Sequence, residues 1–248
     1  MKLVKNFLLG YFLLCSISIL AQTSDQGGPI SWSFNLDLEE RYIPNFQLSK
    51  SNIEKQIKIN DSLELWTKSG FHFGAEQEVD IDFHQNAYWQ QTKKGRIGRL
   101  EISSSEAISL NLIFDQFNLA ERTFLYLYSP DKKELLGAYT SDNNNNQNML
   151  GTDLIHHDEV VVEMFEPNSE FGKSTLHISN VVHGYKDIDN ALGLKVNESG
   201  ACNMDVICSD GLPWVNEIKS VVRILSGGIL CSGTLVNNTA QDGTPYVL

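Results

Sequence analysis

The sequence predicts an all-β fold, of the β-sandwich or jelly-roll type, over most of its length. Three observations predict it. Short runs alternate between apolar and polar residues, turn-forming residues separate these runs, and no long helical pattern is convincing. Short strands at this spacing are typical of β-sandwiches and jelly rolls.

Four regions have the two-residue period of a strand: 99–114, 123–128, 159–165 and 176–182. In the first region the apolar side chains fall on one side, with Ser109 and Asn111 on the other. In the second region three aromatic residues oppose Leu125 and Leu127. The third and fourth regions are rich in Val and Ile, which favour strands.

Turn chemistry separates these strands. Ser129-Pro130-Asp131 and Glu166-Pro167-Asn168-Ser169 have the composition of turns, and residues 141–148 form a polar loop rich in Asn. Residues 23–98 are less regular. We expect strands and loops there, around the apolar islands 65–66, 71–73 and 88–89.

The first 21 residues have the layout of a secretory signal peptide. Lys2 and Lys5 precede an apolar run, and small or polar residues follow, which predicts cleavage between Ala21 and Gln22. The alternative is a membrane anchor, but the apolar run of about fourteen residues is shorter than the roughly 20 that a bilayer requires. We therefore expect a secreted protein with no membrane span after the leader is removed.

The charge excludes one class of partner. The chain of 248 residues has 31 acidic and 19 basic side chains, a net charge of −12. Removal of the leader takes away two lysines and makes the balance more negative. Such a surface repels phosphate backbones, so we expect no nucleic-acid partner.

Two groups of polar residues resemble sites. His156-His157-Asp158 suggests a metal cluster, but neighbouring strand residues point to opposite faces, so we expect a solvated turn. Asp80 and Asp82, with Glu78, would share one strand face and could form an acid–base pair. Nothing else in that segment supports catalysis, so a solvated strand face is the better interpretation. We predict neither a metal nor a cofactor.

The cysteines are concentrated near the end of the sequence. After removal of the leader three remain, Cys202, Cys208 and Cys231. An odd number in an exported protein predicts a free thiol, an intermolecular bridge or a missing partner. Their spacing lacks the paired C-x2-C units of zinc sites. The asymmetry indicates two regions with different means of stabilisation, and a boundary shortly before Cys202.

The most specific motifs also lie in this last part. The sequence contains Ser199-Gly200-Ala201-Cys202-Asn203-Met204-Asp205-Val206-Ile207-Cys208, then Cys231-Ser232-Gly233-Thr234-Leu235-Val236-Asn237-Asn238, and Pro245-Tyr246-Val247-Leu248. These motifs resemble, in order and approximate spacing, the start of the catalytic domain in lysyl endopeptidase-like serine peptidases of the trypsin fold. Residues 109–119 and 176–185 resemble the pro-region that precedes such domains. The resemblance covers about residues 95–248.

The resemblance implies a division of the chain into a signal peptide (1–21), a β-rich pro-region (22–195) and the first strands of a trypsin-like double β-barrel (196–248). In the family the motif with the catalytic histidine follows directly after the position of Leu248. No catalytic residue is therefore assigned in this chain, which we expect to be inactive as given. The disulfide partners of all three cysteines would also lie beyond Leu248.

Further expectations follow from the resemblance. The full-length parent would hydrolyse protein or peptide substrates, and its pro-region would contact its own peptidase domain. Lys195–Val196 is the candidate activation cleavage, because a lysine-specific enzyme could cut its own precursor there. Ser226-Gly227-Gly228 is expected to be a β-turn between two barrel strands rather than a nucleophile turn.

A second interpretation comes from a different functional class. A secreted β-sandwich without catalysis could be a binding module, and the Tyr88-Trp89 pair would suit a carbohydrate ligand. The cysteine pattern and the strand 231–236 favour the peptidase precursor.

Overall fold

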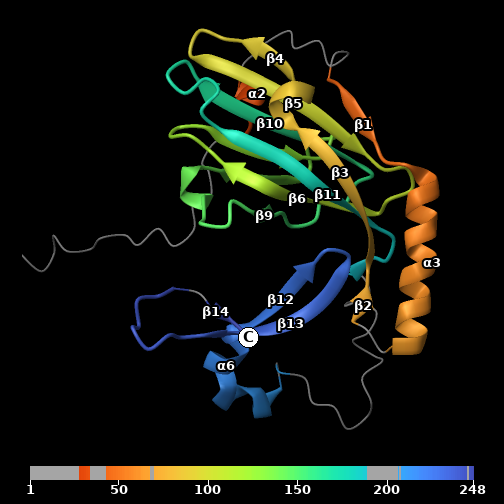
Figure 1. Ribbon diagram of the computed structural model, residues 1–248. Coiled ribbons are helices and arrows are strands. Elements are labelled where there is room, and N and C mark those ends of the chain that lie inside the picture. Colours follow the sequence, from red (N-terminus) through yellow and green to blue (C-terminus); the bar gives the residue numbers. More distant parts are fainter. Residues whose placement is uncertain (1–27, 34–42, 68–69, 189–205, 207, 245) are drawn as a thin grey trace, which may run out of the picture.

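Two β-sheets pack face to face and form the main body of the protein (Figure 1). The computed structural model describes residues 28–33, 43–67, 70–188, 206, 208–244 and 246–248. The first sheet has six strands in the order β1-β5-β10-β7-β8, with β4 also paired to β5. Its strands are β1 (Asn45–Gln47), β4 (Tyr88–Gln91), β5 (Gly95–Ser103), β7 (Phe124–Tyr128), β8 (Leu135–Tyr139) and β10 (Glu159–Pro167).

The second sheet has four strands in the order β3-β11-β6-β9. They are β3 (Gly74–Asp82), β6 (Ser109–Asn118), β9 (Leu150–Gly151) and β11 (Thr175–Gly184). The strands pair antiparallel, and the register of β11 shifts between Ile178 and Asn180. This irregularity places both Ile178 and Val181 in the core, although their spacing would put them on opposite faces of a regular strand.

The main core lies between the two sheets, which confirms the predicted all-β fold with a sandwich. Leu100, Val162 and Leu125 of the first sheet pack in one cluster with Leu112 and Phe114 of the second. Each of these side chains is at most 2% exposed. Alternate residues of facing strands thus supply the core, as the two-residue period predicts.

The first sheet also buries part of its outer face. Tyr126, Tyr128 and Val161 form a second cluster there, against which Trp32 of the short helix α2 (Ile30–Ser33) and Ile43 pack. These strands therefore carry buried side chains on both faces.

Ser109 and Asn111, which the alternation places opposite the apolar side chains of their strand, do not face solvent. Both belong to β6 and are buried, with exposures of 3% and 5%. Gly184 of β11 approaches Ser109 so closely that a Cβ on the glycine would lie 2.0 Å from the Ser109 Oγ. Both faces of the start of β6 are therefore covered by protein.

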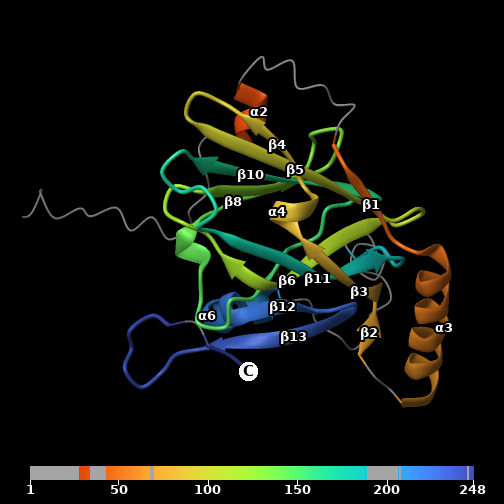
Figure 2. The same ribbon diagram turned by 45° about the horizontal axis from the view of Figure 1, so that its top comes forward.

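An 18-residue helix, α3 (Lys50–Thr67), contradicts the expectation of only strands and loops before residue 98. Figure 2 shows it beside β2 (Phe71–His72) and β3. Its contact with the sandwich depends on Ile53, which is buried, and on Asn60, whose side chain donates a hydrogen bond to the Gly74 carbonyl at 3.0 Å. Ile57 also packs against the core, whereas Ile59 and Leu63 are exposed, so the described apolar residues do not follow a clean helical period.

The loops are found where the turn-forming residues predict them. Ser129 Oγ and the Asp131 carboxylate are 2.7 Å apart in the turn that leads from β7 to β8. The Asn-rich loop begins with a short 3-10 helix, Ser141–Asn143, which is capped by the Thr140 side chain. The strand β8 itself was missing from the predicted elements, as was the short helix α4 (Phe83–Asn86).

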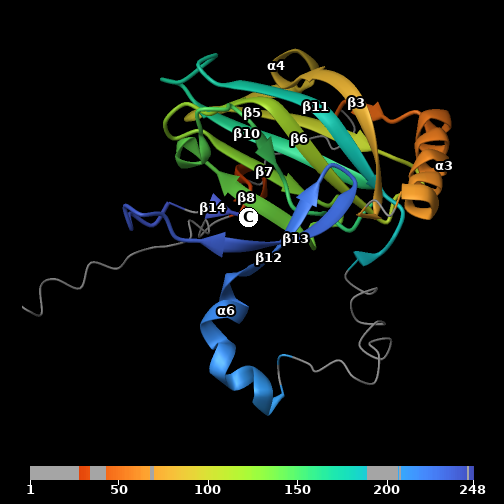
Figure 3. The same cartoon turned by 60° about the horizontal axis from the view of Figure 1, so that its bottom comes forward.

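A third, smaller sheet follows the sandwich in the sequence. The 3-10 helix η4 (Ser209–Trp214) and the helix α6 (Val215–Ser220) lead into β12 (Val221–Ser226), β13 (Ile229–Val236) and β14 (Tyr246–Val247). Figure 3 shows the β12–β13 hairpin beside the sandwich, with α6 projecting away from it. The sheet is open, with β13 paired to β12, β14 and β2.

Candidate functional site

The hairpin formed by β12 and β13 is the part of the chain with the most specific sequence motifs. The two strands pair antiparallel from Val221 opposite Thr234 to Ser226 opposite Ile229. Gly227 and Gly228 form the two-residue connection, with φ of +56° at Gly227. This confirms that Ser226-Gly227-Gly228 is a β-turn between two strands.

Several apolar side chains of this sheet are exposed. Val221 is 60% exposed, Leu235 40%, Tyr246 51% and Val247 46%. In a β-barrel such side chains would be covered by further strands. Within the described residues, these apolar side chains of the open sheet are left uncovered.

The cysteines of this region are exposed thiols. Cys208 precedes η4, and Cys231 lies on β13 opposite Ile224. Neither forms a disulfide within the described part of the chain. Cys202 lies outside the described residues, so disulfides to partners after Leu248 stay a prediction.

The hairpin turn contacts the sandwich. The Gly228 carbonyl accepts hydrogen bonds from the backbone N–H groups of Phe73, at 2.9 Å, and of Gly74, at 3.1 Å. Next to this contact, β13 pairs antiparallel with β2, with Ile229 opposite His72 and Leu230 opposite Phe71. The short strand β2 thus adds to the edge of the hairpin.

Apolar and charged contacts continue this interface. Leu225 and Leu230 of the hairpin pack against a small cluster that includes Phe73 and Val182 of the sandwich. Arg223 of β12 and the carboxylate of Asp153 are 3.5 Å apart. The hairpin therefore has main-chain, apolar and ionic contacts with the preceding region.

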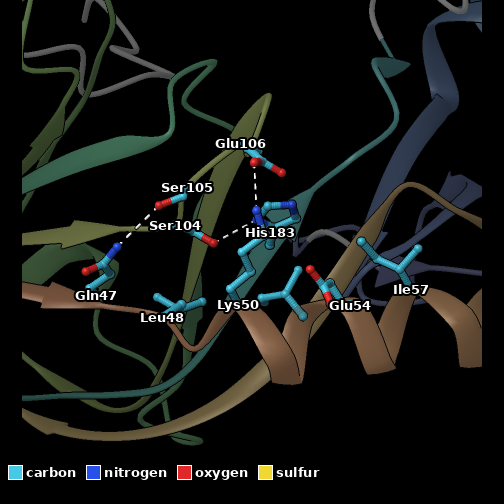
Figure 4. A pocket seen from close by; sticks show the side chains of 10 residues that line it. Gln47, Leu48, Lys50, Glu54, Ile57, Ser104, Ser105, Glu106 and His183 are labelled. Carbon is cyan, nitrogen blue, oxygen red and sulfur yellow. Dashed lines mark hydrogen bonds and ion pairs between the residues drawn. The ribbon is translucent and has the colours of Figure 1, made fainter.

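A separate cavity of about 330 Å³ lies between α3 and the loop that follows β5 (Figure 4). Leu48, Ile53 and Ile57 supply its apolar lining. Lys50 and Glu106 form an exposed ion pair at 2.7 Å, one of the three contacts drawn in Figure 4.

A serine and a histidine are hydrogen-bonded in the wall of this cavity. Ser104 Oγ lies 2.7 Å from His183 Nδ1. Burial lowers the pKa of His183, against the opposing charge of Glu106. Ser104 is only 2% exposed, so its hydroxyl is not accessible to a peptide substrate. The pair fastens the loop to the end of β11 and does not form a nucleophilic site.

The strand carboxylates that were considered as an acid–base pair, and set aside for a solvated strand face, contact separate partners. Asp80 contacts His177 at 2.8 Å, whereas Asp82 caps α4 by accepting a hydrogen bond from the backbone N–H of Gln85. Glu78 is exposed on the same strand. Asp80 and Asp82 thus have different partners, His177 and the start of α4.

His156, His157 and Asp158 lie in a bend before β10. The His156 ring is 3.3 Å from Glu134, and the His157 ring is 3.2 Å from Asp158. In the ranges that the structure describes, no three His, Cys, Asp or Glu side chains gather as metal ligands. No described helix is long and apolar enough to cross a bilayer.

Of the aromatic pair considered for carbohydrate stacking, Trp89 is engaged by protein groups, whereas Tyr88 is exposed. The Arg96 guanidinium lies 4.1 Å from the centroid of the Trp89 ring, and the His84 ring stacks on Trp89 at 5.4 Å. Tyr88 is 43% exposed. Protein groups therefore occupy ring surface on which a sugar would stack.

Three of the predicted cleavage and disulfide positions cannot be placed. The leader with Ala21–Gln22, the Lys195–Val196 bond and Cys202 all lie outside the described residues. Residues 196–248 match the family described as lysyl endopeptidase, C-terminal domain. This match covers the described hairpin and indicates a protease-related segment, with protein substrates as the corresponding class.

Proposed function

We propose that this chain is the N-terminal part of the precursor of a secreted serine endopeptidase. Residues 1–21 would be the leader, 22–195 a pro-region and 196–248 the start of the peptidase domain. The observation that supports this most directly is the match of residues 196–248 to a lysyl endopeptidase domain. The exposed apolar faces of the β12–β13 hairpin agree with an incomplete barrel.

The reaction would be hydrolysis of a peptide bond, with cleavage after lysine as the proposed specificity. Enzymes of this class use a serine that a histidine activates and an aspartate orients, and backbone N–H groups stabilise the oxyanion. All three side chains would lie after Leu248. The residues of this chain would supply the first barrel strands, on which the later strands assemble.

Activation would require separation of the pro-region from the peptidase domain. The Lys195–Val196 bond lies at the start of the family match, which begins at residue 196, and shortly before Ser199-Gly200-Ala201-Cys202. N-terminal sequencing of the mature enzyme should therefore begin at Val196. A mature N-terminus at Asn197 would refute cleavage at this bond and would indicate another protease acting between residues 187 and 199.

The proposal is tested by sequencing the coding region past the codon for Leu248 and expressing the complete product. We expect a Thr-Ala-x-His-Cys motif next, and hydrolysis of a lysyl amide that a serine-directed inhibitor abolishes. An arginyl amide of the same length is the matched control for specificity. A product that hydrolyses neither amide would contradict the proposed function.

A further inference from the structure

We propose that the sandwich has a docking surface for the β12–β13 hairpin, and that this surface keeps the two parts together after the chain between them is cut. The surface consists of β2, Phe73, Gly74 and the small apolar cluster beside them. The partner would be the start of the peptidase domain itself. The inference rests on the proposed function only for the identity of that partner.

The main-chain contacts resemble the addition of a strand to an exposed edge. The Gly228 carbonyl accepts hydrogen bonds from both Phe73 and Gly74, and the next two residues of β13 pair with β2. Strand addition is a common way in which one chain binds another, since main-chain bonds give affinity and side-chain pockets give selectivity.

The side chains supply that selectivity. Phe73 and Val182 are both fully buried in the cluster on which Leu225 and Leu230 pack. Arg223 and Asp153 form a partly exposed ion pair beside this cluster. An apolar centre with a charged margin is the usual arrangement of a specific interface.

The turn glycines show how closely the two parts fit. A Cβ on Gly228 would lie 1.9 Å from the Gly74 carbonyl oxygen, which is an impossible contact with main chain. Gly227 needs to be glycine for its own turn, because its φ is +56°. Gly228 has no φ in this left-handed range, so within the hairpin alone an alanine would be acceptable there. Docking on Gly74 is the reason for glycine at position 228.

The alanine variant of Gly228 therefore separates docking from hairpin formation. We expect Gly228→Ala to weaken binding on the order of ten- to a hundredfold, because one methyl group would be forced against a rigid backbone. Gly151→Ala is the matched control, since a Cβ on Gly151 has no atom within 4 Å. It should bind as the wild type does.

The experiment uses residues 22–248 with a recognition site for a sequence-specific protease placed within 189–199. After cleavage, the two pieces are analysed by size-exclusion chromatography. We expect the wild type and Gly151→Ala to elute as one species, and Gly228→Ala to elute as two. Wild-type pieces that separate would overturn the inference.

Hydrogen exchange of the uncut chain gives a second readout if a cut piece aggregates. We expect protected Phe73 and Gly74 amides in the wild type, and faster exchange of these two in Gly228→Ala with β5 and β10 unchanged. Equal exchange in both proteins would also overturn the inference. Separation of the pieces while the complete product is an active endopeptidase refutes the docking alone. Stable docking with an inactive complete product refutes the proposed function alone.

Discussion

The buried hydroxyl of Tyr128 offers a direct test of what holds the first sheet and the N-terminal segment together. Tyr128 donates a hydrogen bond to the Glu163 carboxylate at 3.0 Å. That carboxylate is fully buried and also accepts hydrogen bonds from the backbone N–H and the hydroxyl of Ser31. Burial, together with the nearby Glu163 charge, holds the pKa of Tyr128 well above its usual value of 10.

The substitution Tyr128→Phe removes the hydroxyl and keeps the ring, which packs edge-on against Trp32 at 5.1 Å between centroids. A hydrogen bond to a charged group contributes about 1.5–3 kcal/mol. Since Ser31 still donates to Glu163, we expect a loss of about 2 kcal/mol in the free energy of unfolding. For a protein of this size that corresponds to a fall in Tm of about 4–8 °C.

The assay is thermal and urea unfolding of residues 22–248, followed by circular dichroism. Tyr139→Phe is the control, because the Tyr139 ring is also largely buried but its hydroxyl makes no hydrogen bond to another described residue. Tyr139→Phe should lower the free energy of unfolding by less than about 0.5 kcal/mol. Equal losses in the two variants would show that the Glu163 hydrogen bond contributes nothing specific.

Two other side chains give independent predictions. Arg96→Met should lower the free energy of unfolding by about 3 kcal/mol, because it removes the guanidinium that bonds to the fully buried Glu166 at 2.7 Å; an unchanged urea midpoint would refute this. Burial lowers the pKa of His177, but hydrogen bonds to Asp115 and Asp80 outweigh it and raise that pKa above 6.5. The protonated ring therefore stabilises the fold below the unfolded pKa, and this contribution disappears as pH rises through the folded pKa. His177→Gln should cost up to about 1 kcal/mol at about pH 5.5 and less at about pH 9, and a loss that grows with pH would contradict this assignment.

The strands that could be predicted from the sequence are those in which apolar residues alternate regularly. Leu125 and Leu127 enter the main core, and the opposite Tyr126 and Tyr128 enter the second cluster. Alternation alone identified the strand but not the burial of both faces, because the cover comes from a segment almost a hundred residues earlier, around Trp32.

The helix α3 was missed for a different reason. Ile59 is 41% exposed and Leu63 38%, so its apolar residues do not form one stripe toward the core. Ile53 and the hydrogen bond from Asn60 attach it instead. Because exposed Ile59 and Leu63 accompany the inward-facing Ile53 and Ile57, the apolar residues give no clean helical period.

The peptidase-like hairpin was predicted in both of its strands and in its turn. Its pairing with β2 was not, since Phe71 and Leu230 are far apart in sequence and no local pattern links them. The glycine at position 228 was interpreted only as a turn residue. The close approach of Gly74 leaves no room for a side chain at position 228, and the sequence alone does not show this contact.

The backbone of Phe73 contacts both the hairpin turn and the chain that follows β11. The Phe73 N–H binds the hairpin turn, while its carbonyl accepts hydrogen bonds from Tyr185 at 2.9 Å and Lys186 at 3.0 Å. Those residues lead directly toward the proposed cleavage segment. The same residue therefore holds both the hairpin turn and the chain that follows β11, so loss of the hairpin contact should also loosen residues 185 and 186.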